Sequence, residues 1–240
     1  MKQLSKPIFL TGICTAAGIL AFFLQLWFFR SVDEKGLLDP SHPGGIVSCV
    51  ITAGVLLFLA ISVYKCKYTC QFSPSPLTAA SALCAVAAIV SAVWVLLSGV
   101  ASILGIITAV FGAFALLCTA VIAMLRLKGH RAHPLLYCSC IVFFIFLLVS
   151  MYQQWSSEPE LGRYCFRLLA LVFLMLTFYQ RTALKVGIGS SSAYLFFSRG
   201  ALFFCLAAVP GGSMWLLYGA MAVSLILDGC TASPKNPQGE

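Results

Sequence analysis

The side chain best placed to bind a ligand is Arg199, which lies about 10 Å inside the seventh apolar run of the chain at 1.5 Å per helical residue. Ser198 precedes it and Tyr194 lies five residues earlier in the same run. A charge at membrane depth is costly to insert and marks a functional site by default. We therefore predict that Arg199, Ser198 and Tyr194 contact a substrate or a lipid phosphate. The alternative is an Arg199 side chain that reaches outward to the membrane surface.

A second pair of cations, Arg163 and Arg167, is spaced four residues apart at the start of the sixth apolar run. Residues at this spacing share one face of a helix, and guanidinium groups bind carboxylates and phosphates through paired hydrogen bonds. The pair is therefore a second candidate contact for an anion. The competing interpretation is that the arginines extend toward the membrane surface and pair with Glu160.

The longest polar loop, residues 30–45, carries the third group of candidate residues. It holds Arg30, Asp33, Asp39 and His42 ahead of a Pro-Gly-Gly turn. Long loops of this kind often serve as lids over a binding cavity. We predict either an outer lid of this type or an ordinary solvated loop.

Catalytic motifs are missing from the sequence. None of the seven acidic residues falls inside a predicted span, and no Walker loop, zinc-binding His-Glu-x-x-His or nucleophile elbow occurs. Most of the 11 cysteines lie in apolar runs, where they act as small apolar fillers. We expect no catalytic apparatus, no cofactor and no metal, and any substrate to be neutral or anionic.

The composition determines which elements must position these residues. Of 240 residues, 61% are hydrophobic and only 9% are charged, whereas soluble domains have about 25% charged residues. Runs of about 20 apolar residues are long enough to cross the hydrocarbon core of a bilayer. They are continuous rather than alternating, which indicates helices and not barrel strands. We predict one all-α domain over residues 1–240, a polytopic transmembrane helix bundle.

Eight apolar runs are expected to form spans, and seven is the main rival count because the last run is the shortest. They are Pro7–Phe29, Gly45–Tyr64, Leu77–Leu97, Ala101–Leu125, Leu135–Tyr152, Tyr164–Gln180, Ser192–Val209 and Gly211–Leu227.

Residues 126–134 form a basic hinge that divides the spans into two sets. With an even number of spans, the side that carries both termini holds ten lysines and arginines, and the other side holds four. Basic loops stay in the cytoplasm, so we predict that both termini are cytoplasmic and that the inner face attracts anionic lipids. The net charge of +8 is explained in this way, without nucleic acid. All four tryptophans fall at outer span ends, which agrees with this threading.

The halves 1–125 and 135–228 have a similar rhythm of spans and loops, which suggests a parallel 4+4 repeat. The alternative is that any eight-span protein obeying the charge rule has this rhythm. Residues 229–240 are expected to form a disordered tail.

Two stretches carry a family resemblance: residues 33–38, Asp-Glu-Lys-Gly-Leu-Leu, and the segment from Trp155 through residues 168–176 to Tyr179. They resemble uncharacterised small integral membrane proteins of gut-type bacteria. The resemblance implies a multi-pass protein of a bacterial inner or plasma membrane. It implies nothing about chemistry.

Three functions are compatible with these features. The first is a non-enzymatic small transporter, permease subunit or accessory protein, which a cavity reaching Arg199 would favour. The second is a membrane enzyme acting on lipid, which a lateral opening facing His130 or His133 would favour. The third is a structural or partner-binding protein, whose partner is another membrane protein or a second copy of the chain and whose bundle would be filled.

Overall fold

A computed structural model of the chain describes residues 7–30, 43–65, 70–71, 76–98, 103–130, 132–155, 161–231 and 233–234. These residues form eight helices, one short 3-10 turn and one pair of two-residue strands. In chain order the elements are α1 (Pro7–Arg30), α2 (Pro43–Lys65), β1 (Cys70–Gln71), α3 (Pro76–Ser98), α4 (Ile103–Leu127), α5 (Leu135–Trp155), α6 (Leu161–Val186), α7 (Ser191–Ala208), η1 (Val209–Gly211), α8 (Trp215–Thr231) and β2 (Ser233–Pro234).

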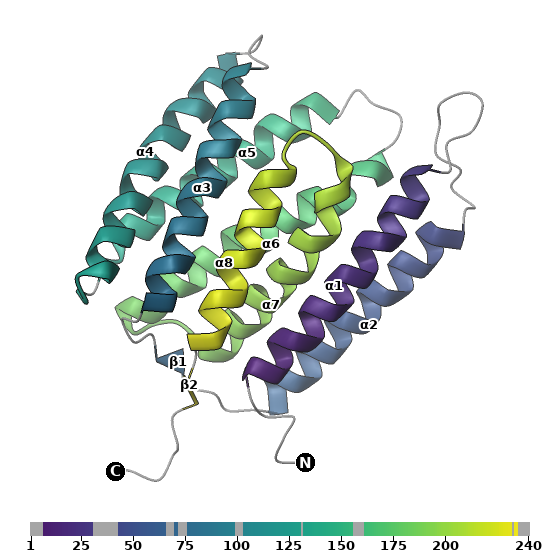
Figure 1. Cartoon of the computed structure of the whole chain (residues 1–240), viewed down its shortest axis with the longest axis horizontal. Helices are drawn as coiled ribbons and strands as arrows, with labels where there is room; N and C mark the ends of the chain where they lie inside the picture. Colours follow the sequence, from purple (N-terminus) through teal and green to yellow (C-terminus); the bar gives the residue numbers. More distant parts are fainter. Residues whose placement is uncertain are drawn as a thin grey trace.

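The helices run alternately up and down, so that α1 begins and α8 ends at the same end of the bundle (Figure 1). We call this the terminus end and the opposite one the far end. Helices α7 and α8 lie in the centre, with the α1–α2 pair on one side and the α3–α4 pair on the other (Figure 1). Helix α5 packs between α4 and α6, and α6 packs against α7.

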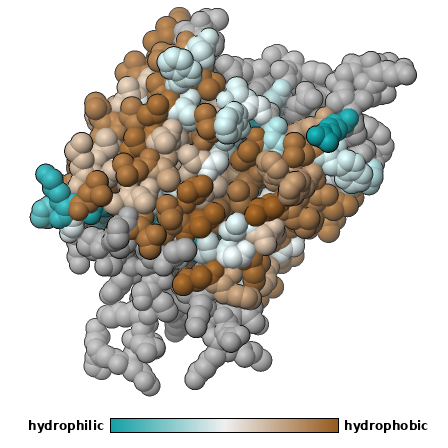
Figure 2. Space-filling view, viewed as in Figure 1, coloured by the Kyte–Doolittle hydropathy of each residue, from teal (hydrophilic) through white to brown (hydrophobic). Residues whose placement is uncertain are grey.

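The outer surface of the bundle is apolar. Figure 2 shows hydrophobic residues over most of the visible face, and side chains such as Phe23 (61% exposed) and Ile103 (79% exposed) project from it. In the described part of the chain, α1 to α7 are each long and apolar enough to cross a membrane, and α8 is a shorter apolar helix. Water-soluble proteins rarely expose apolar patches of this size. The predicted all-α polytopic helix bundle is confirmed.

The tryptophans gather near the far end. Trp27 lies near the end of α1, Trp94 near the end of α3, and Trp215 begins α8, and all three side chains are exposed. Trp155 is the last residue of α5 at the same end. Indole rings favour the headgroup level of a bilayer, so the far end meets one membrane surface.

Two helices extend beyond their predicted ends. Helix α6 continues from Gln180 to Val186, and α8 continues from Leu227 to Thr231, into the segment predicted to be a disordered tail. The next residues of that segment, β2, pair antiparallel with β1, Cys70 opposite Pro234. Both errors have one cause: polar residues were taken to end a span, but here they remain in the helix because they find buried partners.

The packing order does not support the suggested 4+4 repeat. In the second half α6 packs closely against α7. A parallel repeat would place α2 and α3 in the same relation, but the described residues of these two helices make no comparable contact. Instead, the two hairpins of the first half are separated by α7 and α8 (Figure 1). The shared rhythm therefore reflects the rules of charge and span length rather than a duplicated packing unit.

Close approach of α6 and α7 depends on Gly200. A Cβ atom at this position would lie 2.4 Å from the ring of Phe173. The ring cannot easily move away, because Phe196, Phe197 and Phe204 surround it with centroid distances between 4.9 and 6.1 Å.

We predict that Gly200→Ala destabilises the bundle by about 1–3 kcal/mol, the usual cost of overpacking. Gly219→Ala is the matched control, because a Cβ at Gly219 meets nothing within 4 Å and alanine has the higher helix propensity. The measurement is the unfolding temperature of each purified variant in detergent. Equal unfolding temperatures for the two variants would contradict this account of α6–α7 packing.

Candidate functional site

The centre of the candidate site is Asp228, in the last turn of α8, which is 4% exposed. It is the one carboxylate in the part of the chain that the structure describes. Arg181 of α6 donates hydrogen bonds to both carboxylate oxygens. The Ser81 hydroxyl of α3 donates a third, at 2.6 Å to Oδ1. A buried charge is tolerated only when it is paired and hydrogen-bonded, and Asp228 meets both conditions.

Arg126 connects α4 to this ion pair. Its Nη1 atom lies 3.8 Å from Oδ1 of Asp228 and donates hydrogen bonds to the Thr78 carbonyl at 2.7 Å and the Ser81 hydroxyl at 3.2 Å. Its Nη2 atom donates to the Tyr137 hydroxyl of α5 at 3.0 Å. One guanidinium group therefore contacts α3, α5 and α8 together.

Tyr137 lies among three cations. Its hydroxyl also accepts a hydrogen bond from Lys185 Nζ at 3.2 Å, and Lys185 donates a second bond to the Ala132 carbonyl at 3.0 Å. Lys185 Nζ and the Cζ atoms of Arg181 and Arg126 lie 4.5, 5.5 and 6.0 Å from the ring centroid. Cations at these distances are attracted to the ring. We call the residues whose side chains make these contacts the Asp228 cluster: Ser81, Arg126, Tyr137, Arg181, Lys185 and Asp228.

Positive charge is in excess in the Asp228 cluster. It holds three cations and one carboxylate, and Arg181 takes the main share of that carboxylate. Apart from the 3.8 Å approach to Asp228, Arg126 and Lys185 bind neutral oxygens of Thr78, Ser81, Ala132 and Tyr137. Cations are favourable near the C-terminal ends of α4 and α6, where the helix dipoles are negative. The local charge remains positive nonetheless.

A small, partly open cavity of about 20 Å³ lies beside the cluster, which is enough space for a water molecule. The polar residues among those that line it are Ser81, Thr119, Arg126, Tyr137, Arg181 and Ser224, but the surface that the cavity exposes is mostly apolar. Its apolar lining consists of Ala82, Ala85, Ile122 and Phe178. Asp228 is not among the lining residues.

Arg199 points into the bundle rather than outward. It is 1% exposed, and its Nη1 atom donates to the Leu225 carbonyl at 3.5 Å near the end of α8. Its guanidinium lies over Gly229 beside Thr11, because a Cβ at Gly229 would be 2.5 Å from Nη1 and 2.8 Å from the Thr11 hydroxyl. Tyr194 and Ser198 are buried with it on α7. None of these three predicted residues is among those that line the cavity beside the Asp228 cluster.

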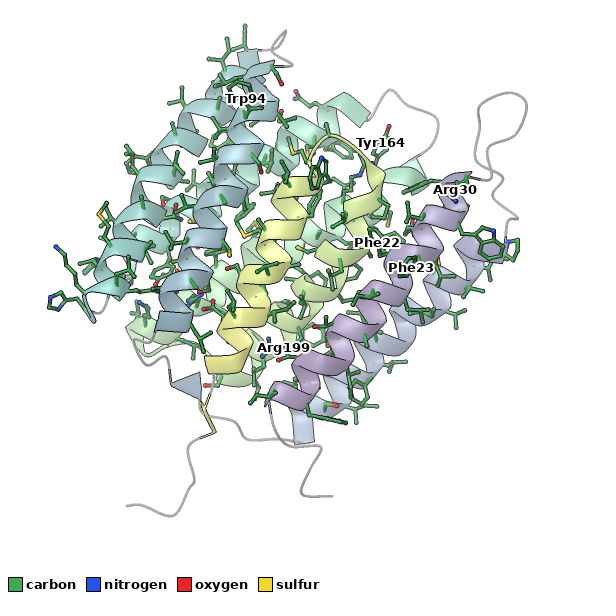
Figure 3. The ribbon with its side chains drawn as sticks, viewed as in Figure 1. Phe22, Phe23, Arg30, Trp94, Tyr164 and Arg199 are labelled. Carbon is green, nitrogen blue, oxygen red and sulfur yellow. The ribbon has the colours of Figure 1, made fainter. Side chains whose placement is uncertain are left out.

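Arg167 lies at the other end of α8 from Arg199. Its Cζ atom is 5.2 Å from the Tyr164 ring centroid, and its guanidinium packs against Gly212, where φ is 149°. Figure 3 places Tyr164 and Arg199 toward opposite ends of the bundle, and the 17 residues of α8 span about 25 Å between them. One small ligand cannot contact both arginines.

The remaining predicted residues are largely outside the described structure. Asp33, Asp39 and His42 lie beyond the described residues, as does the side chain of Arg163. Arg30 is exposed at the end of α1 (Figure 3). The lid hypothesis therefore remains a prediction.

Two charged residues that were assigned to loops lie in helices. Arg181 lies inside the candidate span α6, and Asp228 lies in the last turn of the shorter apolar helix α8, whereas the seven candidate spans of the described residues contain no acidic residue. One signal was available: Arg181 and Lys185 are four residues apart, the spacing of one helix face. That pattern continues α6 by more than a turn.

Comparison with models of protein families, with curated proteins and with solved structures found no match to this chain. The Asp228 cluster and its cavity are therefore the observations from which a function can be argued.

We predict that Asp228→Asn lowers the free energy of unfolding by about 3–5 kcal/mol, because it leaves Arg181 and Arg126 buried without a counter-charge. Arg30→Gln, at an exposed position, serves as the control and should have no effect. Replacing both partners, Arg181→Leu with Asp228→Leu, should recover much of the loss, since apolar pairs often substitute for buried ion pairs. Unfolding temperatures in detergent measure all three. An Asp228→Asn protein as stable as the unchanged chain would refute this role for the ion pair.

Proposed function

We propose that this protein is a non-enzymatic, multi-pass membrane protein that handles a small solute, as a small transporter, permease subunit or accessory protein. The observation that supports it best is the small cavity beside the Asp228 cluster, which residues of five helices line, among them the buried Arg181 and the partly buried Arg126. Charged groups inside membrane bundles are costly and are typically retained along solute or ion pathways. Helices α3, α4, α5, α6 and α8 all contribute to this lining.

The alternatives have less support. An enzyme acting on lipid was expected to turn His130 or His133 toward an opening, but both histidines are exposed in the turn between α4 and α5, and neither lines the cavity. A purely structural bundle was expected to be filled, whereas this one leaves a small cavity beside Arg126 and Arg181. The transport hypothesis expected a cavity at Arg199; we now place the solute beside Arg126 and Arg181 instead.

We further propose that the terminus end faces the cytoplasm of a bacterium, as the charge rule and the family resemblance imply. Arg126, Lys128, Arg181 and Lys185 lie at the terminus end, and Arg30 lies at the far end. Basic residues are enriched on the cytoplasmic side of membrane proteins.

We expect a green fluorescent protein fused after Glu240 to fluoresce and an alkaline phosphatase at the same position to be inactive, because each works on one side of the membrane. The same pair of reporters fused after Arg30 should give the reverse pattern. Phosphatase activity from the Glu240 fusion would overturn the proposed orientation.

The transport proposal predicts that purified protein in sealed vesicles admits at least one small solute faster than protein-free vesicles do. Stopped-flow light scattering with a panel of small organic acids, amides and sugars measures this swelling. Ala85→Leu fills the cavity and should reduce the rate at least by half, whereas Ala53→Leu on the exposed face of α2 should not. Rates equal to those of empty vesicles for the whole panel would rule out transport by this chain alone.

A further inference from the structure

We propose that the terminus end of the bundle binds the headgroup of an anionic phospholipid, at a surface formed by the α4–α5 turn and the ends of α4 and α6. The inference goes beyond the proposed function, because it concerns the lipid around the protein and not a solute that passes through it. It assigns to particular residues the attraction for anionic lipids that the charge distribution predicts. We call these residues the headgroup surface: Leu127, Lys128, His133, Leu135, Lys185 and Ile188.

Helices α4 and α6 end at this surface in the same way. Gly129 and Gly187 have φ values of 73° and 88°, the left-handed conformation in which glycine ends a helix. The next residue in each case, His130 or Ile188, donates a hydrogen bond to the backbone carbonyl five residues earlier, at 2.8 and 3.0 Å. Both ends are therefore Schellman motifs. A lysine lies one residue before Gly129 and two residues before Gly187, so each motif places an ammonium group where the chain leaves the bundle.

Lys185 joins the end of α6 to the α4–α5 turn. Its Nζ atom donates hydrogen bonds to the Ala132 carbonyl at 3.0 Å and the Tyr137 hydroxyl at 3.2 Å. An ammonium group has three hydrogens to donate, and no described residue accepts the third. The side chain is half-buried, so this hydrogen is available to a phosphate oxygen at the surface.

His133 supplies a second donor. Its Nδ1 atom accepts a hydrogen bond from the Leu135 backbone N–H at 3.4 Å. A neutral imidazole that accepts at Nδ1 carries its hydrogen on Nε2. Because His133 is exposed, the Nε2–H group can donate to a headgroup next to the ammonium of Lys185.

The exposed charge of the headgroup surface is positive. Lys128 is exposed, whereas Asp228, the one carboxylate in the part of the chain that the structure describes, is buried and bonded to Arg181. The negative dipole ends of α4 and α6 are offset by the positive ends of α5 and α7, which begin at the same end of the bundle. An anionic headgroup is therefore attracted to the surface, and no described carboxylate is exposed to repel it.

Exposed apolar side chains favour a lipid over a soluble anion. Leu127 ends α4, Leu135 begins α5, and both are more than half exposed. Ile188, next to Gly187, is 84% exposed. These side chains gain nothing from a free phosphate ion, but acyl chains remove them from water. Basic donors beside exposed apolar residues are typical of the level at which a bilayer changes from headgroups to acyl chains.

The test uses the full chain in a non-ionic detergent, titrated with dioleoylphosphatidylglycerol. Dioleoylphosphatidylcholine is the reference lipid, because it has the same acyl chains and a zwitterionic headgroup. Native mass spectrometry measures the fraction of protein with bound lipid. We expect phosphatidylglycerol to bind at least about fivefold more tightly, the factor that one basic residue contributes at an anionic surface. Equal affinities for the two lipids would overturn the proposal.

Two lysine variants test the assigned donors. Lys185→Gln should weaken phosphatidylglycerol binding about tenfold, the usual loss for a charge-assisted hydrogen bond, and Lys128→Gln about fivefold, the loss of one surface charge. Neither should change phosphatidylcholine binding. Lys185→Arg guards against misfolding, since it keeps the charge and should keep most of the affinity. Lys128 is exposed and not needed for folding, so a Lys128→Gln chain that binds phosphatidylglycerol as tightly as the unchanged chain would refute the site.

Arg30→Gln is the matched control, because Arg30 is an exposed basic residue at the far end. It should leave phosphatidylglycerol binding unchanged, and a loss as large as that of Lys128→Gln would show diffuse attraction by net charge and overturn the proposal.

Glycerol 3-phosphate distinguishes the lipid from a soluble anion that has the same phosphate chemistry. We expect it not to displace phosphatidylglycerol, because it has no acyl chains to cover Leu127, Leu135 and Ile188. Displacement at concentrations similar to those of the lipid would indicate a soluble-anion site instead.

Discussion

The negative charge of the Asp228 carboxylate is disfavoured in two ways, by loss of contact with water and by the dipole of its own helix. It is buried, and it lies in the C-terminal turn of α8, where the helix dipole is already negative. Arg181 and Arg126 relieve the first problem, and Arg199 relieves the second by donating to the Leu225 carbonyl of the same helix. Three arginines from three other helices therefore converge on the end of α8. The packing of the terminus end depends on this compensation.

The spans could be predicted from the sequence, because a lipid-facing helix must be apolar over about 20 residues. The site could not, because its charges lie at helix ends, where hydropathy cannot separate a paired charge from a solvated one. Arg181 and Asp228 are 47 residues apart, and nothing local assigns one to the other. Arg199 is buried and contacts α8 and Thr11 rather than reaching outward, and its expected contact with a substrate or lipid remains a prediction.

The sequence also could not predict which helices pack against each other, because every span is apolar on most faces and so has no unique partner. One signal was present. Among the seven candidate spans, α7 is the most buried and among the least apolar, and α2 is the least buried and the most apolar. Helix α7 occupies the centre of the bundle, where close contacts such as that of Gly200 with Phe173 replace contacts with lipid.

The tryptophans and the Asp228 cluster lie at opposite rims of the molecule. Trp27, Trp94 and Trp215 are exposed near the far end, and the aromatic ring at the cluster is a tyrosine. Indole emission therefore samples a single leaflet. A water-soluble quencher added outside sealed vesicles reduces the tryptophan fluorescence of molecules inserted in one orientation and leaves that of the other orientation unchanged. The intrinsic fluorescence of the chain therefore reports its orientation in the membrane.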